Sequence, residues 1–230
     1  MNDNATPLSA QAYDKEINKT IPFYREFYAQ TLDVIAQCGF EKIRWLDLGC
    51  GTGTLEACAL AQFPDASFVL LDPSEKMLEQ AMEKLSACRT DETGEGAFDY
   101  ICKTSAEIDF TDAFEVVTAI QSHHYMSADE RQTAVEKVYR ALKKDGIFVC
   151  FENVIPEEED VKAQELLRWG RYQQRQGKTA QEAKEHNARC GVNYFPLTVG
   201  QHIELLKQTG FRSVHVFWIS YMQMGIYGRK

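Results

Sequence analysis

Residues 45–56 constrain the fold more than any other stretch, with the sequence Trp-Leu-Asp-Leu-Gly-Cys-Gly-Thr-Gly-Thr-Leu-Glu. An apolar run meets three glycines at alternate positions, Gly49, Gly51 and Gly53, and a helical pattern begins at about Thr54. Glycine lets the backbone adopt positive φ angles and come close to a ligand. A helix N-terminus adds unpaired N–H groups and the positive end of the helix dipole. The stretch therefore predicts a strand, a tight ligand-binding loop and the start of a helix.

The glycine spacing argues against a bound dinucleotide. A dinucleotide-binding loop has glycine at its first, third and sixth positions, and the sixth position here is Thr54. Asp47 also stands two residues before the first glycine. A carboxylate at the strand tip repels a pyrophosphate, but it attracts an ammonium group or accepts hydrogen bonds from backbone N–H groups. This departure disfavours a nicotinamide dehydrogenase.

A second acidic residue follows the next apolar run, which covers residues 67–72 and is expected to be a strand buried on both faces. Asp72 at its tip can accept hydrogen bonds from both hydroxyls of a ribose, as in other nucleoside-binding α/β sheets. The alternative is that Asp72 caps the helix that follows Pro73, although Ser74 is the better capping residue.

Residues 47–53 resemble the first motif of the class I S-adenosylmethionine-dependent methyltransferases, and the resemblance extends over about residues 40–230. It implies a doubly wound, Rossmann-like α/β fold, whose seven-stranded sheet is mostly parallel, and S-adenosylmethionine as the cofactor. Residues 105–107 match the segment that borders the adenine in this family, with an ordinary loop as the alternative. The cofactor-binding residues expected on these grounds are Asp47, Gly49, Cys50, Gly51, Asp72, Pro73, Met77, Ser105, Ala106, Glu107, Gln121 and Tyr13.

The remaining pattern completes the expected sheet. Apolar runs predict strands at about residues 43–48, 98–103, 113–120 and 147–152, and helices at about 54–63, 128–144 and 198–209. Residues 89–96 are polar and are expected to form a surface loop. The last two apolar runs, 213–219 and 221–227, are almost contiguous, and parallel strands cannot be joined by so short a connection. They are therefore expected to form an antiparallel C-terminal hairpin.

Two helical segments are expected around a single methyltransferase domain that spans residues 1–230. Residues 1–40 predict an N-terminal helical cap divided at Pro22, and residues 155–195 predict a helical lid inserted before the last helix. Their aromatic and basic side chains either pack against the core and face solvent, or line the substrate pocket. The substrate-binding candidates are Tyr24, Tyr28, Arg168, Trp169, Tyr172 and Arg189.

His123 and His124 follow the fourth predicted strand, where ligands lie in an open parallel sheet. We expect one of them to be bonded under the loop and the other to lie in the pocket as a candidate catalytic base, because neutral imidazole titrates near working pH. Adjacent residues rarely bind one metal together, and no carboxylate at helical spacing completes a site. No metal is therefore expected.

Bulk properties limit the partners and the compartment. The formal charge of −9 and the pI of about 5.1 argue against a broad nucleic-acid-binding surface. Seven cysteines with no C-x-x-C spacing fit a reducing cytosol. No signal-peptide pattern or membrane-spanning apolar run is present. We expect a cytoplasmic protein with a small-molecule substrate, either a monomer or a homodimer.

These features together predict S-adenosylmethionine-dependent methyl transfer to a small-molecule acceptor. One alternative is a cofactor-modifying enzyme, because Ile21-Pro22-Phe23-Tyr24 and the region of Arg189 resemble carboxy-S-adenosylmethionine synthase, and an arginine there could hold an extra carboxylate. A tRNA-modifying methyltransferase is disfavoured by the acidic pI. A non-catalytic S-adenosylmethionine-binding module stays open, because Asp47, the glycines and Asp72 would only bind the cofactor.

Overall fold

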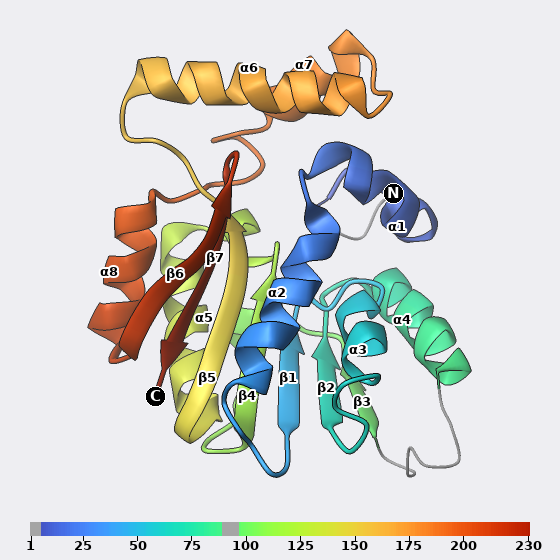
Figure 1. Ribbon diagram of the computed structural model, residues 1–230, viewed down its shortest axis with the longest axis vertical. Coiled ribbons are helices and arrows are strands. Elements are labelled where there is room, and N and C mark those ends of the chain that lie inside the picture. Colours follow the sequence, from blue (N-terminus) through green and yellow to red (C-terminus); the bar gives the residue numbers. More distant parts are fainter. Residues whose placement is uncertain (1–5, 89–96) are drawn as a thin grey trace.

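A computed structural model describes residues 6–88 and 97–230 and shows a seven-stranded sheet with the order β3-β2-β1-β4-β5-β7-β6 (Figure 1). The first five strands run parallel, and β7 pairs antiparallel with both β5 and β6. The predicted fold class and C-terminal hairpin are therefore confirmed. The strands are β1 Arg44–Leu48, β2 Ser67–Leu71, β3 Phe98–Ile101, β4 Phe114–Ile120, β5 Leu142–Asn153, β6 Arg212–Ser220 and β7 Gln223–Arg229.

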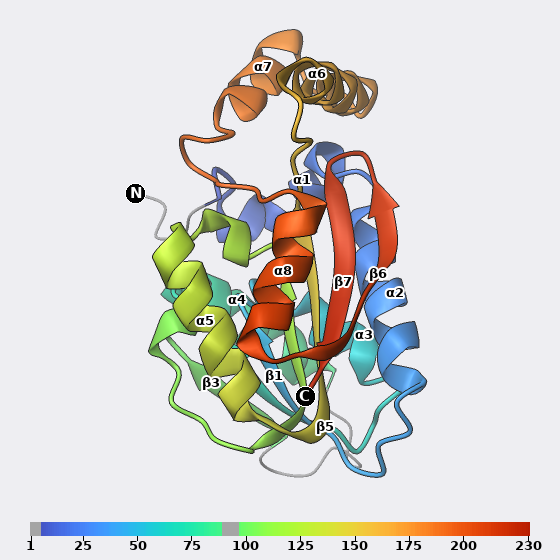
Figure 2. The same cartoon turned by 90° about the vertical axis from the view of Figure 1, so that its left-hand side faces the viewer.

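Helices cover both faces of the sheet (Figures 1 and 2). Trp45 of β1 packs in the core beneath α2, α3 and α4, whereas Leu46 and Leu48 face the core beneath α5 and α8. This alternation follows from the two-residue period of a strand, with both faces apolar because both are covered. The helices are α1 Ala10–Thr20, α2 Tyr24–Ala36, α3 Thr54–Ala59, α4 Glu75–Ala87, α5 Ala128–Ala141, α6 Glu159–Arg175, α7 Ala180–Ala188 and α8 Val199–Thr209, with short 3₁₀ turns η1 Ser105–Glu107 and η2 His123–Tyr125.

Several element boundaries differ from the sequence prediction, among them the ends of two helices. The helix expected over 54–63 ends at Ala59, and the helix expected over 128–144 ends at Ala141. In the second case β5 begins at Leu142, opposite Phe114 of β4, and the register shifts before Val116. Asp145 has a φ of 64°, so a left-handed residue lies inside this strand. Because residues 143–145 are polar, the apolar pattern of the sequence does not predict that β5 begins at Leu142. The expected surface loop at 89–96 lies outside the described residues.

The α6–α7 pair extends beyond the end of the sheet and lies near α1 (Figure 1). Trp169 of α6 is fully buried, and its Nε1 donates a hydrogen bond to the carbonyl oxygen of Thr20 over 2.7 Å. The Tyr172 hydroxyl donates to the carbonyl oxygen of Asn18 over 3.0 Å. Both acceptors belong to the last turn of α1, where helix carbonyls lack partners within the helix. The α6–α7 pair is therefore attached to α1, while its role as a lid stays a prediction.

We expect Trp169→Phe to lower the free energy of unfolding by about 1 kcal/mol, because the Thr20 carbonyl loses a buried hydrogen-bond donor. Urea denaturation followed by circular dichroism measures this change. Trp218→Phe is the control, since Trp218 packs against Phe27 and Phe151 and forms no side-chain hydrogen bond within the described residues. Equal losses in both variants would show that ring size, and not the hydrogen bond, matters at position 169.

Candidate active site

A cavity of about 290 Å³ lies beyond the carboxyl ends of β1, β2, β3 and β4. Ligands are expected at this edge of an open parallel sheet. Of the predicted cofactor-binding residues, all but Glu107 line the cavity; Glu107 instead accepts hydrogen bonds from the backbone and hydroxyl of Thr104. The predicted residues in the lining are Tyr13, Tyr24, Tyr28, Asp47, Gly49, Cys50, Gly51, Asp72, Pro73, Met77, Ser105, Ala106 and Gln121.

The glycine loop needs glycine for two different reasons. Gly49 has a φ of 74°, and a Cβ atom added to it would lie 2.5 Å from the Cβ of Ser122. Gly51 also has a left-handed backbone, with a φ of 55°, but an added Cβ would meet no atom within 4 Å. Gly49 thus permits contact with the residues after β4, whereas Gly51 leaves open space at the cavity wall where a ligand can approach the backbone.

Asp72 holds the glycine loop against the tip of β2. Its Oδ2 accepts a hydrogen bond from the backbone N–H of Gly51 over 3.0 Å, and its Oδ1 accepts from the N–H of Ser74 over 2.9 Å. Ser74 is the helix cap, as predicted, because its hydroxyl accepts from the N–H of Met77. Each carboxylate oxygen can accept more than one hydrogen bond, so these contacts are compatible with the predicted ribose contacts.

Asp47 lies on the cavity wall at the end of a buried hydrogen-bond chain. The indole of Trp45 donates to the hydroxyl of Thr118 over 2.8 Å, and that hydroxyl donates to Asp47 Oδ1 over 2.5 Å. Burial raises the pKa of Asp47 to about 6. A cationic ligand group next to this carboxyl would stabilise its charged form.

Glu56 lies next to Asp47 in the first turn of α3, and the sequence pattern does not predict a role for it. The side chain is fully buried, and its carboxyl group faces that of Asp47 closely enough to share a hydrogen bond when one of the two is protonated. Burial and the nearby negative charge of Asp47 raise the pKa of Glu56 well above its usual range. The pair therefore carries less than two negative charges at neutral pH, as expected for carboxyls that share a buried site.

Three tyrosines from the N-terminal helices form one wall of the cavity. The hydroxyls of Tyr13 and Tyr24 lie 3.1 Å apart, and the rings of Tyr24 and Tyr28 meet edge to face with centroids 5.3 Å apart. Burial raises the pKa of all three well above the usual range. These hydroxyls are therefore protonated at neutral pH and act as hydrogen-bonding groups rather than bases.

The structure places neither His123 nor His124 in the cavity lining. Both are buried, and Glu152 of β5 binds the backbone N–H of each, with distances of 3.1 and 2.9 Å. Glu152 Oε2 also lies 2.8 Å from Nδ1 of His124. Burial lowers the pKa of His123 to about 4. The histidine expected in the pocket as a candidate base is therefore not there. Glu152 holds the η2 turn from one side, and the Arg131 side chain donates a hydrogen bond to the carbonyl oxygen of His123.

A smaller chamber of about 30 Å³ adjoins the main cavity, and Tyr13, Gln121 and Tyr125 line both. Arg189, predicted to reach inward, also lines this chamber. Gln121 is 7% exposed, has a φ of 58°, and neither amide atom has a partner among the described residues. A strained backbone and an orphaned buried amide are features of ligand-binding positions.

The other predicted substrate-binding residues of α6 lie outside both cavities. Trp169 and Tyr172 bond α1, as described above. Arg168 bonds Glu165 and stacks over the Tyr221 ring, with its guanidinium carbon 4.0 Å from the ring centroid. These side chains attach α6 to its surroundings, and the structure does not bring them to the candidate site.

Further lining residues were not predicted from the sequence. Most of them flank predicted motifs, and Thr52 and Leu55 belong to the glycine-loop stretch itself. No feature of the sequence predicts that Thr6 and Glu130 line the cavity. These additional residues are Thr6, Thr52, Leu55, Thr104, Ile120, Ser122, Tyr125, Met126 and Glu130.

Neither a metal centre nor a membrane-spanning helix is found in the part of the chain that the structure describes. Over residues 6–88 and 97–230, no group of three or more His, Cys, Asp or Glu side chains could hold a metal ion. None of the helices in those ranges combines the length and the apolar character needed to cross a bilayer.

We expect Glu56→Gln to become more stable than the wild type as the pH rises. The folded state holds a proton on Glu56 that the unfolded state releases above a pKa of about 4.5, so the wild type loses stability with increasing pH. The difference grows by up to about 1.4 kcal/mol per pH unit. Urea unfolding at about pH 5 and about pH 8 measures it.

Glu79→Gln on the exposed surface of α4 is the control for this experiment. Its stability relative to the wild type should stay nearly constant over the same pH range. A Glu56→Gln variant that is less stable than the wild type at the higher pH would contradict a protonated Glu56.

Residues 46–146 match a family model described as a methyltransferase domain. The chain is 24% identical over 207 residues to a carboxy-S-adenosyl-L-methionine synthase from Nautilia profundicola, covering 90% of this chain and 86% of the relative. It is 26% identical over 219 residues to a protein of the same name from Helicobacter hepaticus, covering 92% and 89%. These relatives match nearly the whole chain at low identity.

Solved structures agree with the fold. The YcgJ protein from Bacillus subtilis superposes with a TM-score of 0.65 at 16% identity, covering 90% of this chain and 98% of that one. A phosphoethanolamine N-methyltransferase 2 from Haemonchus contortus, in complex with phosphomonomethylethanolamine and S-adenosylhomocysteine, gives 0.60 at 20% identity, covering 90% and 42%. Residues 46–146 of the chain thus match a methyltransferase domain, and the glycine loop, Asp47 and Asp72 of this part lie together at one cavity.

Proposed function

We propose that this enzyme transfers a methyl group from S-adenosylmethionine to a small-molecule acceptor, a small group of which can enter the chamber beside the cofactor cavity. The observation that supports this proposal is the shared wall between the two spaces. Tyr13, Gln121 and Tyr125 line both the larger cavity and the smaller chamber. A ligand in one space therefore lies next to a ligand in the other, as transfer between two bound molecules requires.

The residues that line the larger cavity suit the chemical groups of the cofactor. Asp72 would accept the ribose hydroxyls, and Asp47 would face the α-amino group. The open space at Gly51 accommodates close approach of the amino-acid part, while Met77, Ser105 and Ala106 would border the adenine. When bound, S-adenosylmethionine supplies a methyl group that its sulfonium already activates. The chain's own residues then need to orient the acceptor and exclude water.

The arrangement favours an acceptor that needs no strong base. Tyr13, Tyr24 and Tyr28 keep their protons at neutral pH, and His123 and His124 do not line the cavity. A thiolate, a neutral amine or a carboxylate can attack without losing a proton to the protein beforehand. An unactivated alcohol is disfavoured, because it requires a positioned general base.

A second candidate function is transfer of a carboxyl group from a carboxylic-acid donor to the methyl carbon of the cofactor; the bond to the donor breaks, and the methyl carbon gives up one proton to the remainder of the donor. It is favoured by Arg189 in a chamber of about 30 Å³, which is large enough for a small anionic group. A guanidinium binds a carboxylate with paired, charge-assisted hydrogen bonds. The relatives named above are carboxy-S-adenosyl-L-methionine synthases, although their identity to this chain is low.

We expect Asp72→Asn to weaken S-adenosylhomocysteine binding by about ten- to a hundredfold, because hydrogen bonds to a charged acceptor are worth about 1.5–3 kcal/mol. Isothermal titration calorimetry measures the dissociation constant. Asp99→Asn, on the exposed side of β3, is the matched control. Unchanged affinity in the Asp72 variant would remove Asp72 from the cofactor site.

Turnover on a panel of thiols, amines, phenols and carboxylates, followed by mass spectrometry, tests the two candidate functions. Methyl transfer predicts S-adenosylhomocysteine together with a methylated acceptor. Cofactor modification predicts a carboxylated cofactor. We expect Arg189→Met to reduce turnover of acidic compounds by tenfold or more and that of neutral compounds little. Tight cofactor binding without any product would instead support a non-catalytic binding module.

A further inference from the structure

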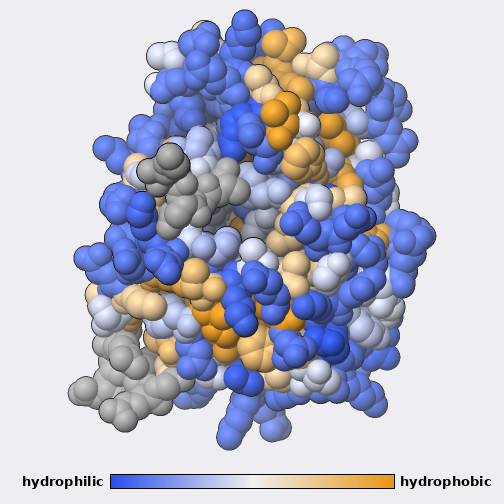
Figure 3. Space-filling view, turned by 180° about the vertical axis from the view of Figure 1, so that it is seen from behind, coloured by the Kyte–Doolittle hydropathy of each residue, from blue (hydrophilic) through white to orange (hydrophobic). Residues whose placement is uncertain are grey.

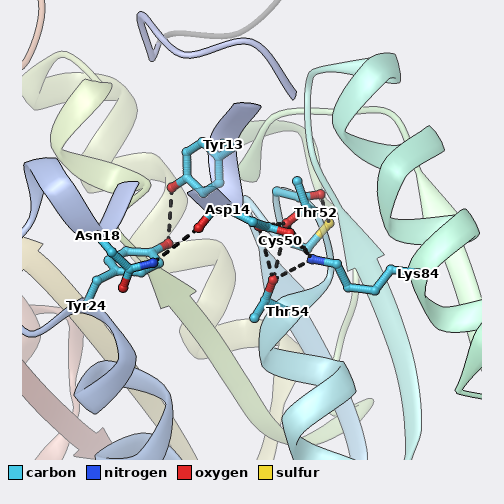
Figure 4. A network of polar contacts seen from close by, with 9 residues as sticks. Tyr13, Asp14, Asn18, Tyr24, Cys50, Thr52, Thr54 and Lys84 are labelled. Carbon is cyan, nitrogen blue, oxygen red and sulfur yellow. Dashed lines mark hydrogen bonds and ion pairs between the residues drawn. The ribbon is translucent and has the colours of Figure 1, made fainter. Parts of the chain in front are cut away.

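Helix α1 is joined to the glycine loop through the carboxylate of Asp14 (Figure 4). The hydroxyl of Thr52 donates to Asp14 Oδ1 over 2.6 Å, and Thr54 donates to the same oxygen over 3.4 Å. Asp14 Oδ2 lies 2.6 Å from Nζ of Lys84 on α4. One side chain of α1 therefore contacts both the loop that faces the cofactor and the helix behind that loop.

Lys84 completes this cluster. Its ammonium group donates to the hydroxyl of Thr52 over 2.9 Å and to that of Thr54 over 2.6 Å. Thr54 occupies the position at which a dinucleotide-binding loop has glycine. A glycine at this position would have no hydroxyl, so the side chain of Thr54 contributes directly to the attachment of α1.

The same helix forms part of the cavity wall. Tyr13 precedes Asp14, lines both cavities and contacts the hydroxyl of Tyr24. A displacement of α1 that separates Asp14 from Lys84 therefore moves Tyr13 as well. Since Tyr13 lines the cavity, this movement changes the enclosure of the cofactor site.

We propose that Asp14 and Lys84 are positioning residues that hold α1 against the glycine loop and thereby set the rate at which the cofactor dissociates. The proposal rests on the placement of the cofactor given under Proposed function. The side chain of Asp14 is 49% exposed and that of Lys84 is 26% exposed. Water and salt can reach this ion pair and compete with it, so the contact can open and close reversibly.

The test is the dissociation rate of radiolabelled S-adenosylhomocysteine, chased with unlabelled ligand. We expect Asp14→Asn and Lys84→Met each to raise this rate about fivefold. Raising the salt concentration should accelerate dissociation from the wild type and have little effect on the two variants. The charge-exchanged double variant, Asp14→Lys with Lys84→Asp, should restore part of the slow rate.

Lys15→Gln on α1 and Glu83→Gln on α4 are matched controls, because both side chains are exposed neighbours of the pair in sequence. Their dissociation rates should equal that of the wild type. Thermal unfolding of each ligand-free variant shows whether the fold is retained. If Asp14→Asn destabilises the fold, the salt dependence of the wild type and the charge-exchanged variant still decide the outcome.

Wild-type dissociation rates in folded Asp14→Asn and Lys84→Met, without any salt dependence in the wild type, would overturn the proposal. This result is distinguishable from failure of the cofactor placement. Asp72→Asn would in that case still weaken binding, whereas unchanged binding in Asp72→Asn would contradict the placement itself. Accelerated dissociation in the controls as well would also overturn the role of this particular pair.

Discussion

The parallel pairing of β1 with β2 on one side and β4 on the other is the constraint on which the site depends. Asp47 pairs in register with Leu70 and with Thr118. Because the strands run in the same direction, the residues that follow them meet at one edge. Asp72, the glycine loop and Gln121 reach the same cavity for this reason, although they are far apart in the sequence.

Buried carboxyl groups in this fold differ because their partners differ. Glu152 accepts hydrogen bonds from two backbone N–H groups. Its hydrogen bond with the His124 ring and the neighbouring imidazoles outweigh burial and lower its pKa to about 2. Glu56 is equally buried but faces the carboxyl of Asp47, so burial and this neighbouring negative charge raise its pKa. Glu152 is therefore charged and holds the η2 turn in place, whereas Glu56 stays neutral in its buried position.

The sequence predicts those parts of the site that depend on local chemistry. Asp47, the glycines and Asp72 lie in or directly after strands with a clear apolar pattern, so their position could be predicted without the fold. The role of His124 could not, because its partner Glu152 is 28 residues away on β5. The contact between Asp14 and Lys84 spans 70 residues. Such pairs become visible only when the helices are placed on the sheet.

The attachment of α1 at both ends has a consequence for how the two binding spaces communicate. Its N-terminal half bonds the glycine loop, and its C-terminal turn bonds α6 through Trp169 and Tyr172. Ile17 and Thr20, on the same helix as Tyr13, also line the smaller chamber. A rigid helix that forms part of two walls cannot tilt to enlarge one space without reshaping the other. A movement of α1 would therefore reshape both spaces at once.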